Sequence, residues 1–539
     1  MPAIRLFPNI SAHSTLETQT MKLTRKTGLA LAALAALTLT ACGGGDDDAP
    51  PPAPVPVPQP APTPTPPAPT PTPPAPTPTP PAPAPARDRI EPFDLPAGKN
   101  SAEPARSHLP AQAAVAQIDL GALAQAKSDA VLNQNSGPGV PLQIGLSRAV
   151  QASATADSLD TLLNWTPTAQ GTQVAAVRFT SAQAHGVRLG LKVQRLPEGA
   201  QLRFYDNASG EVQEISARQV QELLALNRQA DGASASQTYW SPDFGGEATT
   251  LEIELPAGAS AADVQLAVPT LIHNVIDPAR VHDFQLKGIG DSGSCNLNVT
   301  CNSALLNTES RAEAQMVYVK ADGESYVCSG TLMNDARNSR IPYFLTANHC
   351  LSTQSEASTL QTRWFFRAAS CGSATSLYSG SQRLTRGARM LYASASTDTA
   401  FMQLNEAPPA GVRYAGSYFG GVVPLEAAVT GVHHPKGDLQ KYSSGGVRSY
   451  TRLQHTSQGT LMLEDSTPQN FLTVQWLEGT TEGGSSGSGL FASTENGQKR
   501  YLVGQLFGGD ASCANRRGGD AYGRFDLAYN AALKRWLNP

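Results

Sequence analysis

Three short segments carry side chains that together could break an acyl bond. His349 lies in the run Leu-Thr-Ala-Asn-His-Cys, Asp398 in Ser-Thr-Asp-Thr-Ala, and Ser486 in Gly-Gly-Ser-Ser-Gly-Ser. A serine hydroxyl becomes a good nucleophile when an imidazole accepts its proton, and the imidazole needs a carboxylate that fixes its tautomer. His, Asp, Ser is one of the chain orders in which these groups converge. The three residues are therefore candidates for general base, orienting carboxylate and nucleophile.

Glycines surround the candidate serine. They let two backbone N–H groups, those of Gly484 and Ser486, face a developing oxyanion without an intervening side chain. The same run matches the Gly-x-Ser-x-Gly turn of α/β-hydrolases, but that fold needs a His after the Ser, and the last His here is His455. Residues 288–293 match Gly-x-Gly-x-x-Gly, but no helix is predicted after them. We therefore expect no dinucleotide site and no cofactor.

The chain that carries these segments has 539 residues, which is long enough for two or more domains. Its 40 basic and 44 acidic residues give a net charge of −4. This is not the basic excess of a nucleic-acid binder, so no nucleic-acid partner is expected. Residues 50–86 hold 21 of the 42 prolines and no charged side chain. Because proline fixes φ and lacks an N–H, residues 43–87 are expected to form an extended, disordered linker.

An export segment precedes this linker. Met21, the expected start of translation, opens a basic stretch that ends at Lys26, and an apolar run too short to span a bilayer follows. The run ends in Leu-Thr-Ala-Cys, which resembles the bacterial lipobox and implies a lipid on Cys42. Residues 1–42 are thus expected to be a lipoprotein-type signal segment, with Cys42 as the membrane anchor of an outer-membrane or cell-surface protein. The alternative is an ordinary signal peptide with a chance cysteine.

Six further cysteines lie in the second half of the chain: Cys295, Cys301, Cys328, Cys350, Cys371 and Cys513. An even number in an exported chain predicts three disulfides, and spacing alone leaves about 15 pairings open. The chain has no Cys-x-x-Cys pair, and only one of these cysteines adjoins a His. No metal site is expected.

The remaining chain divides near residue 288. Residues 88–287 have no Cys and contain runs that alternate apolar and polar residues, such as 187–193 and 250–255. Such alternation predicts half-buried strands, hence a β-sandwich-like domain, with one helix near 216–226. Four scattered histidines in this part are expected to be structural or exposed: His108, His185, His273 and His282.

The segments around His349 and Ser486 resemble those of chymotrypsin-like serine endopeptidases, and most of all those of bacterial lysyl endopeptidases. The resemblance covers residues 288–539, is vaguer over 88–287 and is absent from the linker. Further matching segments are Gly293–Asn296, His433–Pro435, Val474–Trp476, Gly504–Leu506 and Asp520–Arg524.

This resemblance implies an all-β fold, a chymotrypsin-like double β-barrel preceded by a β-rich propeptide domain and the Pro-rich linker. The two barrels would have six strands each, with the site between them. The resemblance makes Ser486 the nucleophile, His349 the general base and Asp398 its partner in an acyl-enzyme mechanism that acts on proteins or peptides. It implies the disulfides Cys295–Cys513, Cys301–Cys371 and Cys328–Cys350.

Two positions depart from the family pattern. Phe507 stands where lysyl endopeptidases have a His that stacks on a Trp, here Trp476, which is expected beside the catalytic histidine. Asn348 replaces the more usual Ala or His before His349. We expect both departures to affect the pH optimum and the rate rather than the reaction class.

Asp520 indicates the specificity. A pocket for a cationic side chain needs a carboxylate, because a desolvated ammonium is costly unless paired. Asp520 follows Gly508 and Gly509, which should form a pocket wall, and it matches the lysine-selecting Asp of the resembling family. We expect cleavage after Lys, with Arg left open because the two side chains differ in reach and geometry. The alternatives are a plain loop Asp and a glutamate-selecting protease, which would need a cationic or His-lined pocket.

The resemblance also implies self-cleavage between Lys287 and Gly288, a few residues before the matching segments begin. Residues 88–287 would then be a propeptide that assists folding, and residues 288–539 the protease domain. Ser485 stands where animal enzymes have the Asp that pairs with the freed amine, so activation must rest on release of the propeptide. The rival hypotheses are an inactive homologue and a lipid-anchored surface binding protein.

Overall fold

The computed structural model describes residues 88–98, 104–134, 137–206, 210–232, 237–276, 292–371, 378–456, 459–493, 497 and 499–539. All of these belong to the stretch Ala86–Pro539 of one compact unit. The expected signal segment, the Pro-rich linker and the cut after Lys287 lie outside the described residues. Within the described residues, no helix is long and apolar enough to cross a membrane.

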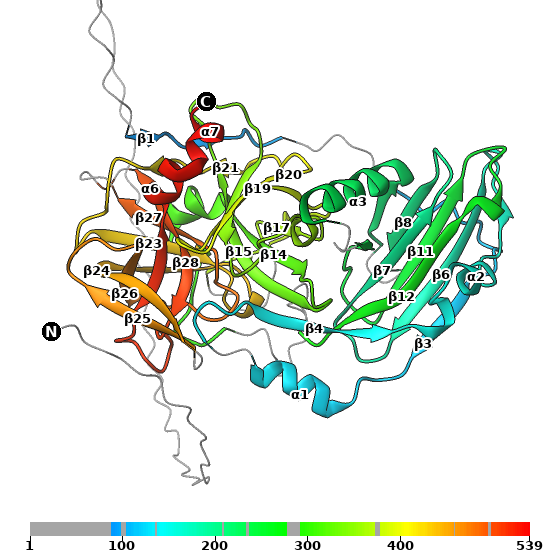
Figure 1. Cartoon of the computed structure of the whole chain (residues 1–539), viewed down its shortest axis with the longest axis horizontal. Coiled ribbons are helices and arrows are strands. Elements are labelled where there is room, and N and C mark those ends of the chain that lie inside the picture. Colours follow the sequence, from blue (N-terminus) through cyan, green and yellow to red (C-terminus); the bar gives the residue numbers. More distant parts are fainter. Residues whose placement is uncertain are drawn as a thin grey trace, which may run out of the picture. The chain divides into compact units, whose positions relative to one another are not determined.

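The first half of the described chain is a β-sandwich, as the alternating runs predict (Figure 1). One sheet has the order β3 (Ala116–Leu120), β6 (Gln173–Ser181), β11 (Ala248–Leu255), β8 (Gln201–Tyr205) and β9 (Val212–Ser216), with β5 (Thr166–Pro167) beside β6. The facing strands are β10 (Thr238–Trp240), β7 (Gly186–Arg195), β12 (Gln265–Asn274) and β4 (Leu142–Ala149). Fully buried side chains such as Phe179, Leu189 and Ile253 fill the space between the sheets.

Strand β11 differs from the half-buried strand that its alternation predicts, because all eight of its residues are buried. The segment before β3 covers its polar face. Ser107 Oγ donates to Glu252 (2.5 Å), the backbone N–H of His108 donates to the same carboxylate (3.0 Å), and Arg203 forms an ion pair with it (3.0 Å). The buried carboxylate is thus paired and hydrogen-bonded, as burial of a charge requires.

The helix expected near 216–226 is α3 (Ala217–Asp231). Ser216 and Gln219 form a reciprocal capping box at its start, and the helix ends before Gly232, whose φ is +90°. Val220 and Leu224, four residues apart, face the core. The helix is longer than expected. Its capping box fixes the start at Ser216, and it continues until Gly232, whose positive φ ends it.

Most of the remaining strands form two β-barrels. The first has the order β18 (Gln382–Leu384), β17 (Gln361–Trp364), β14 (Glu313–Val319), β15 (Ser325–Met333), β16 (Tyr343–Ala347), β20 (Thr399–Leu404) and β19 (Ala388–Ser394). The second runs β28 (Arg500–Gly509), β27 (Gly489–Ser493), β23 (Ala428–His433), β24 (Lys441–Thr456), β26 (Phe471–Glu478) and β29 (Asp520–Arg524). Because β29 also pairs with β28, these six strands close into a ring. The expected double barrel is confirmed, with one short strand, β18, added to the first barrel.

Short elements complete the described chain. The helices are α1 (Gln125–Gln134), α2 (Ala156–Asp160), α4 (Ser303–Leu306), α5 (Gln354–Ala357), α6 (Phe525–Ala528) and α7 (Lys534–Leu537). The strands are β1 (Arg89–Ile90), β2 (Phe93–Asp94), β13 (Leu297–Asn298), β21 (Arg413–Tyr414), β22 (Ser417–Tyr418) and β25 (Gly459–Asp465).

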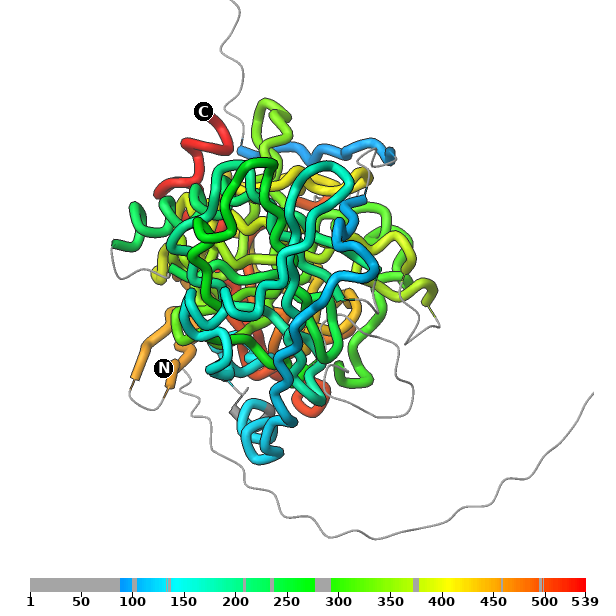
Figure 2. Tube along the Cα trace, turned by 90° about the vertical axis from the view of Figure 1, so that its right-hand side faces the viewer, coloured from blue at the N-terminus to red at the C-terminus, as the bar shows by residue number. Residues whose placement is uncertain are grey.

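Both ends of the described chain lie on the same side of the molecule (Figures 1 and 2). Ile90, at the start, packs in one apolar cluster with Leu533 and Leu537 at the end. Strand β1 pairs with β22, so the segment that precedes the sandwich is attached to the second barrel.

Three disulfides join Cys295 to Cys513, Cys301 to Cys371 and Cys328 to Cys350. These are the pairs that the family resemblance implies. The Cys328–Cys350 bridge links β15 to the residue directly after His349, so it anchors the loop of the candidate base to a barrel strand.

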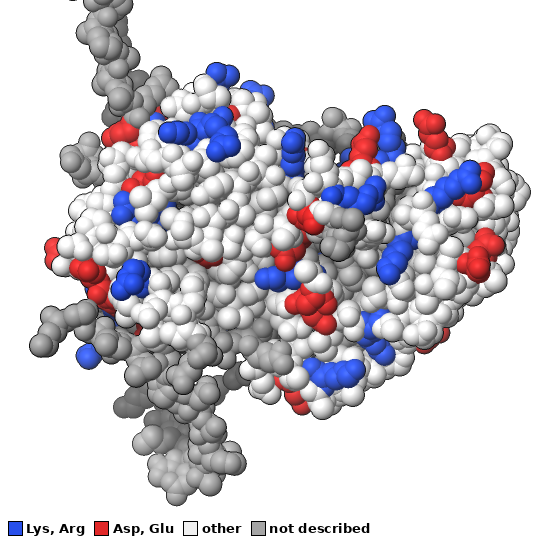
Figure 3. Space-filling model, in the orientation of Figure 1, with Lys and Arg blue, Asp and Glu red and all other residues white. Residues whose placement is uncertain are grey.

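Charged side chains on the face drawn in Figure 3 are mixed, with Lys and Arg interspersed among Asp and Glu. This agrees with the net charge of −4.

Candidate active site

Asp398 holds His349 by two hydrogen bonds. Its Oδ2 lies 2.7 Å from His349 Nδ1, and its Oδ1 accepts from the His349 backbone N–H at 2.8 Å. The Asp398 carbonyl also accepts from the N–H of Asn348 (2.9 Å). Since Nδ1 is engaged, Nε2 is the nitrogen left to accept a proton.

The positions of both side chains follow from the pairing of β16 with β20. Ala347 pairs with Thr399, so the chain leaves β16 directly into His349 at the place where Asp398 enters β20. Asp398 has φ +50°, a left-handed conformation that non-glycine residues adopt at a cost of about 1–3 kcal/mol. Gln505 of the second barrel donates to the Thr397 carbonyl (2.7 Å) and the Asp398 carbonyl (3.1 Å) and so fixes this turn.

Ser486 reaches the same place from the second barrel. Its carbonyl accepts from the Ser329 N–H (2.8 Å), and the next N–H, that of Gly487, donates to the Leu506 carbonyl (2.8 Å). A Cβ at Gly487 would overlap Thr346 Oγ1 and would lie 2.8 Å from the Ala347 nitrogen. The loop of Ser486 therefore packs against the end of β16, two residues before His349. The structure brings the three predicted residues into one region.

The loop before Ser486 has the shape that an oxyanion site needs. Gly484 has φ +94°, and a Cβ there would lie 2.9 Å from the Gly437 nitrogen and the His434 oxygen, so glycine is required. Neither the Gly484 nor the Ser486 N–H donates to a partner within the described part of the chain. Two open donors beside a serine hydroxyl can stabilise a developing negative charge on an acyl oxygen.

Ser485 is held from inside the barrel. Its hydroxyl lies 2.8 Å from Nδ1 of the buried His433, whose Nε2 lies 3.0 Å from Ser443 Oγ. Burial lowers the pKa of His433 to about 3, so this imidazole stays neutral. The position before the candidate nucleophile thus has a side-chain partner within the barrel and needs no terminal amine. The His433–Pro435 match in the sequence was the available clue to this contact.

Asp520 is buried at the start of β29 with one carboxylate oxygen satisfied and the other unsatisfied. Its Oδ2 accepts from Trp476 Nε1 (2.7 Å) and Thr481 Oγ1 (2.6 Å). Its Oδ1 makes no hydrogen bond of ordinary length and angle among the described residues, and the nearby Ala511 N–H lowers the pKa of the carboxyl only in part against the effect of burial. Burial is the main cause that raises the pKa of Asp520 to about 6. A buried carboxylate with a free oxygen suits a cationic ligand.

The glycines expected to line a pocket lie at the end of β28. Gly509 pairs with Asp520, and a Cβ at Gly509 would lie 2.6 Å from the free Oδ1. The same Cβ would overlap the Gly519 carbonyl oxygen, so only glycine fits beside this carboxylate. Gly508 has φ +129°, and a Cβ there would lie 3.1 Å from the Cα of Pro138, in the segment that leads into β4.

Trp476 and Phe507 contact different residues of the candidate site. The indole of Trp476 donates to Asp520 and its ring packs edge-on against Tyr522, with ring centroids 6.1 Å apart. The ring of Phe507 lies beside His349, with ring centroids 5.6 Å apart and planes at 79°. Among the described residues, Phe507 is thus the aromatic ring in contact with the imidazole, and Trp476 holds the carboxylate of Asp520.

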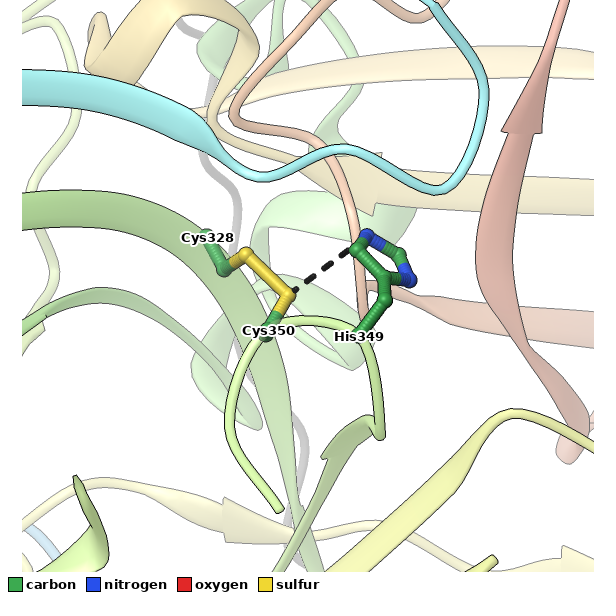
Figure 4. A group of neighbouring side chains, drawn as sticks. All are labelled: Cys328, His349 and Cys350. Carbon is green, nitrogen blue, oxygen red and sulfur yellow. Dashed lines mark hydrogen bonds between the residues drawn. A yellow bond between two sulfur atoms is a disulfide. The ribbon is translucent and has the colours of Figure 1, made fainter. Parts of the chain in front are cut away.

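Cys328, His349 and Cys350 form a compact group with possible metal-ligating atoms (Figure 4). His349 Nε2 lies 3.8 Å from Cys350 Sγ. Both sulfurs are bonded to each other in a disulfide, and a metal requires thiolate ligands. The group is therefore a structural support of the histidine rather than a metal centre.

Comparisons with known proteins agree with this arrangement. Residues 289–523 match the family model "Lysyl endopeptidase, C-terminal domain", and residues 114–275 match "Lysyl endopeptidase N-terminal domain". The chain is 32% identical over 420 residues to a lysyl endopeptidase of Pseudomonas aeruginosa, which covers 75% of this chain and 82% of that protein.

Similar solved structures include two proteases. One is a Mycobacterium tuberculosis (M. tuberculosis) protease in its active form, with 14% identity and a TM-score of 0.30, covering 48% of this chain and 93% of that one. The other is an HtrA-type protease with a tripeptide, with 14% identity and a TM-score of 0.29, covering 43% and 62%. Both TM-scores are too low to add to the argument. By its two family domains and its curated relative, the chain belongs to the lysyl endopeptidase family of serine endopeptidases.

Proposed function

We propose that this exported endopeptidase hydrolyses peptide bonds on the carboxyl side of lysine. The observation that carries the proposal is the unpartnered Oδ1 of the buried Asp520. A lysine side chain that reaches this carboxylate would place its ammonium against the free oxygen. The pairing would offset the cost of the buried carboxylate and select a cation over an apolar or acidic side chain.

In the proposed reaction, Ser486 Oγ attacks the carbonyl carbon of the lysine residue while its proton passes to His349 Nε2. The N–H groups of Gly484 and Ser486 stabilise the oxyanion, and Asp398 stabilises the imidazolium. The imidazolium then gives its proton to the leaving amine, which leaves an acyl-enzyme on Ser486. A water molecule, deprotonated by His349, hydrolyses this ester and restores the free serine.

The same specificity supports self-processing after Lys287 and a division of the chain into a propeptide (88–287) and a protease domain (288–539). The first described residues of the protease domain dock beside the nucleophile loop. Glu482 accepts from the Gly293 N–H (2.7 Å) and from Asn296 Nδ2 (2.7 Å). Since His433 already holds Ser485, activation in this proposal depends on removal of the propeptide and not on a freed amine.

The proposal places the chain outside the cytoplasm. Three disulfides are typical of exported proteins. The lipobox-like run at Cys42 supports a lipid anchor on the propeptide side, from which the mature protease would be released by the cut.

Substitution of Asp520 tests the specificity. We expect Asp520→Asn to lower kcat/KM on a peptide with lysine before the scissile bond by at least about 100-fold, because loss of one partner of a buried pair costs about 3–5 kcal/mol. Wild-type enzyme should prefer Lys over Glu and Phe in matched peptides. The exposed Asp465→Asn is the matched control and should leave kcat/KM unchanged. Full activity of Asp520→Asn on the lysine peptide, or a preference for Glu or Phe, would refute the assignment.

Lysine recognition should depend on pH near 6. Below that pH the carboxyl of Asp520 is protonated and neutral, and above it the carboxylate attracts the ammonium, because the pKa of Asp520 lies at about 6. The ratio of kcat/KM on a lysine peptide to kcat/KM on a phenylalanine peptide should therefore rise as the pH increases from about 5 to about 7. The phenylalanine peptide serves as the reference because its side chain carries no charge for Asp520 to attract. A ratio that stays flat over this range would show that Asp520 does not bind the substrate cation.

Gly484 tests the oxyanion site. A methyl group at this position would press on the backbone of His434 and Gly437 and would displace the N–H. We expect Gly484→Ala to lower kcat on the lysine peptide by about 10²–10³-fold, the usual loss when an oxyanion donor is removed. Gly421→Ala is the matched control, since Gly421 also has a positive φ but faces open space. Equal kcat values for the two variants would contradict the role of Gly484.

A further inference from the structure

A strand of the N-terminal sandwich continues into the catalytic barrel. Strand β4 pairs with β12 of the sandwich on one side and with β15 of the first barrel on the other. Leu142 pairs with Val327, the residue before Cys328, whose disulfide partner follows His349. Leu142 also lies 3.6 Å from a Cβ built at Gly483, in the loop before Ser486. One end of the segment is therefore fixed at the β15 side of the candidate site.

The residues before β4 reach the opposite side of the same site. The Gly139 N–H donates to the Phe507 carbonyl (3.2 Å), and Phe507 is the residue whose ring borders His349. A Cβ at Gly139, where φ is +74°, would overlap the Phe507 ring. Pro138 contacts Gly508, the neighbour of the pocket glycine Gly509. The chain thus crosses from the Phe507–Gly508 side to β15 within three residues, from Gly139 to Leu142.

Residues 138–143 run across the candidate site in the direction in which a bound substrate would run. A substrate with its lysine near Asp520 has its preceding residues along the Phe507–Gly508 wall, and its leaving part continues past the nucleophile. Residues 138–139 occupy the first side and residues 142–143 the second. Val140 and Pro141 are the residues between them, so the peptide bond that passes the nucleophile is the one that joins Val140 to Pro141.

This bond is a poor substrate. The side chain of Val140 is 46% exposed, so it does not fill the pocket of Asp520, and valine has no cation to offer. Pro141 is buried, and its nitrogen carries no hydrogen and is locked in a ring. The segment can therefore occupy the site without meeting the proposed requirement for lysine.

Further contacts hold the sandwich on the protease barrels. Asp231 at the end of α3 accepts from the backbone N–H groups of Gln354 (3.2 Å) and Ser355 (2.6 Å) at the start of α5. The fully buried Arg188 donates to the Thr359 carbonyl (2.9 Å). These contacts do not depend on the covalent link near residue 287, so a cut there would leave the sandwich bound.

We propose that residues 137–143 are a built-in inhibitory strand, which lies in the substrate direction with the Val140–Pro141 bond at the nucleophile and blocks the site until the sandwich is removed. This inference rests on the proposed function. It adds that a cut after Lys287 is by itself insufficient, and that the edge of β15 is the surface that takes the leaving part of a polypeptide.

The test uses the full chain with Lys287→Ala, which keeps the sandwich attached. Added Gly139→Val should force the segment off Phe507 and raise kcat/KM on a short lysine peptide at least about 10-fold over the Lys287→Ala parent. Gly171→Val is the matched control, because Gly171 has φ +80° but faces open space in the sandwich. It should leave the parent rate unchanged. A Gly139→Val chain that folds and stays as slow as its parent would overturn the proposal.

A second variant tests whether the bond between residues 140 and 141 lies at the nucleophile. It also provides a test of the proposal if Gly139→Val fails to fold. In the Lys287→Ala chain, Val140→Lys with Pro141→Ala supplies a lysine and an ordinary peptide bond at the nucleophile. Intact mass should show a cut after residue 140 that is absent when Ser486→Ala is added, and failure to cut would overturn the assigned register. Wild-type chain freed of its sandwich is assayed in parallel on the lysine peptide. If that enzyme is inactive, the proposed function fails; if it is active, either negative result counts against the inhibitory strand alone.

Discussion

The rest of the site depends on the two hydrogen bonds between His349 and the carboxylate of Asp398. A neutral imidazole can turn and can carry its proton on either nitrogen, whereas the two bonds from Asp398, to Nδ1 and to the backbone N–H, leave one orientation and one tautomer. The left-handed turn at Asp398 that makes both bonds possible carries strain. Gln505 stabilises that turn from the other barrel, so the geometry of the base depends on how the two barrels pack.

In the proposed mechanism, the second barrel supplies the groups around this pair that act on a substrate. The loop of Ser486 is fixed by Ser329 of the first barrel, by Leu506 and by the His433–Ser485 contact, which leaves its N–H groups free to point outward. The pocket follows a different physical rule. Its carboxylate is buried with one oxygen paired and one unpaired, which is unfavourable until a cation arrives. In this account, the energy of substrate binding comes from relieving that burial.

Much of the site could be predicted from the sequence. Chemistry and chain order alone indicated His349, Asp398 and Ser486, and the family resemblance added the disulfide pairs and Asp520. Contacts between distant segments could not be predicted, because period-two alternation identifies a strand but not its partner. The pairing of β4 with β15 is one such contact, and the coverage of β11 by Ser107 and His108 is another. The contacts of Trp476 on β26 and of Phe507 on β28 could not be predicted either, since they depend on how these strands lie against Asp520 and His349.

The central claim is that Ser486 is a nucleophile activated through His349 by Asp398. The most direct measurement is covalent labelling of the mature enzyme by a fluorophosphonate, with the adduct located by mass spectrometry. The account predicts one adduct, on Ser486, and labelling that is slower by about 10⁴-fold in Asp398→Asn, as expected when the imidazole loses its fixed tautomer. Labelling of Ser486→Ala at the wild-type rate, or of Asp398→Asn without loss of rate, would contradict it.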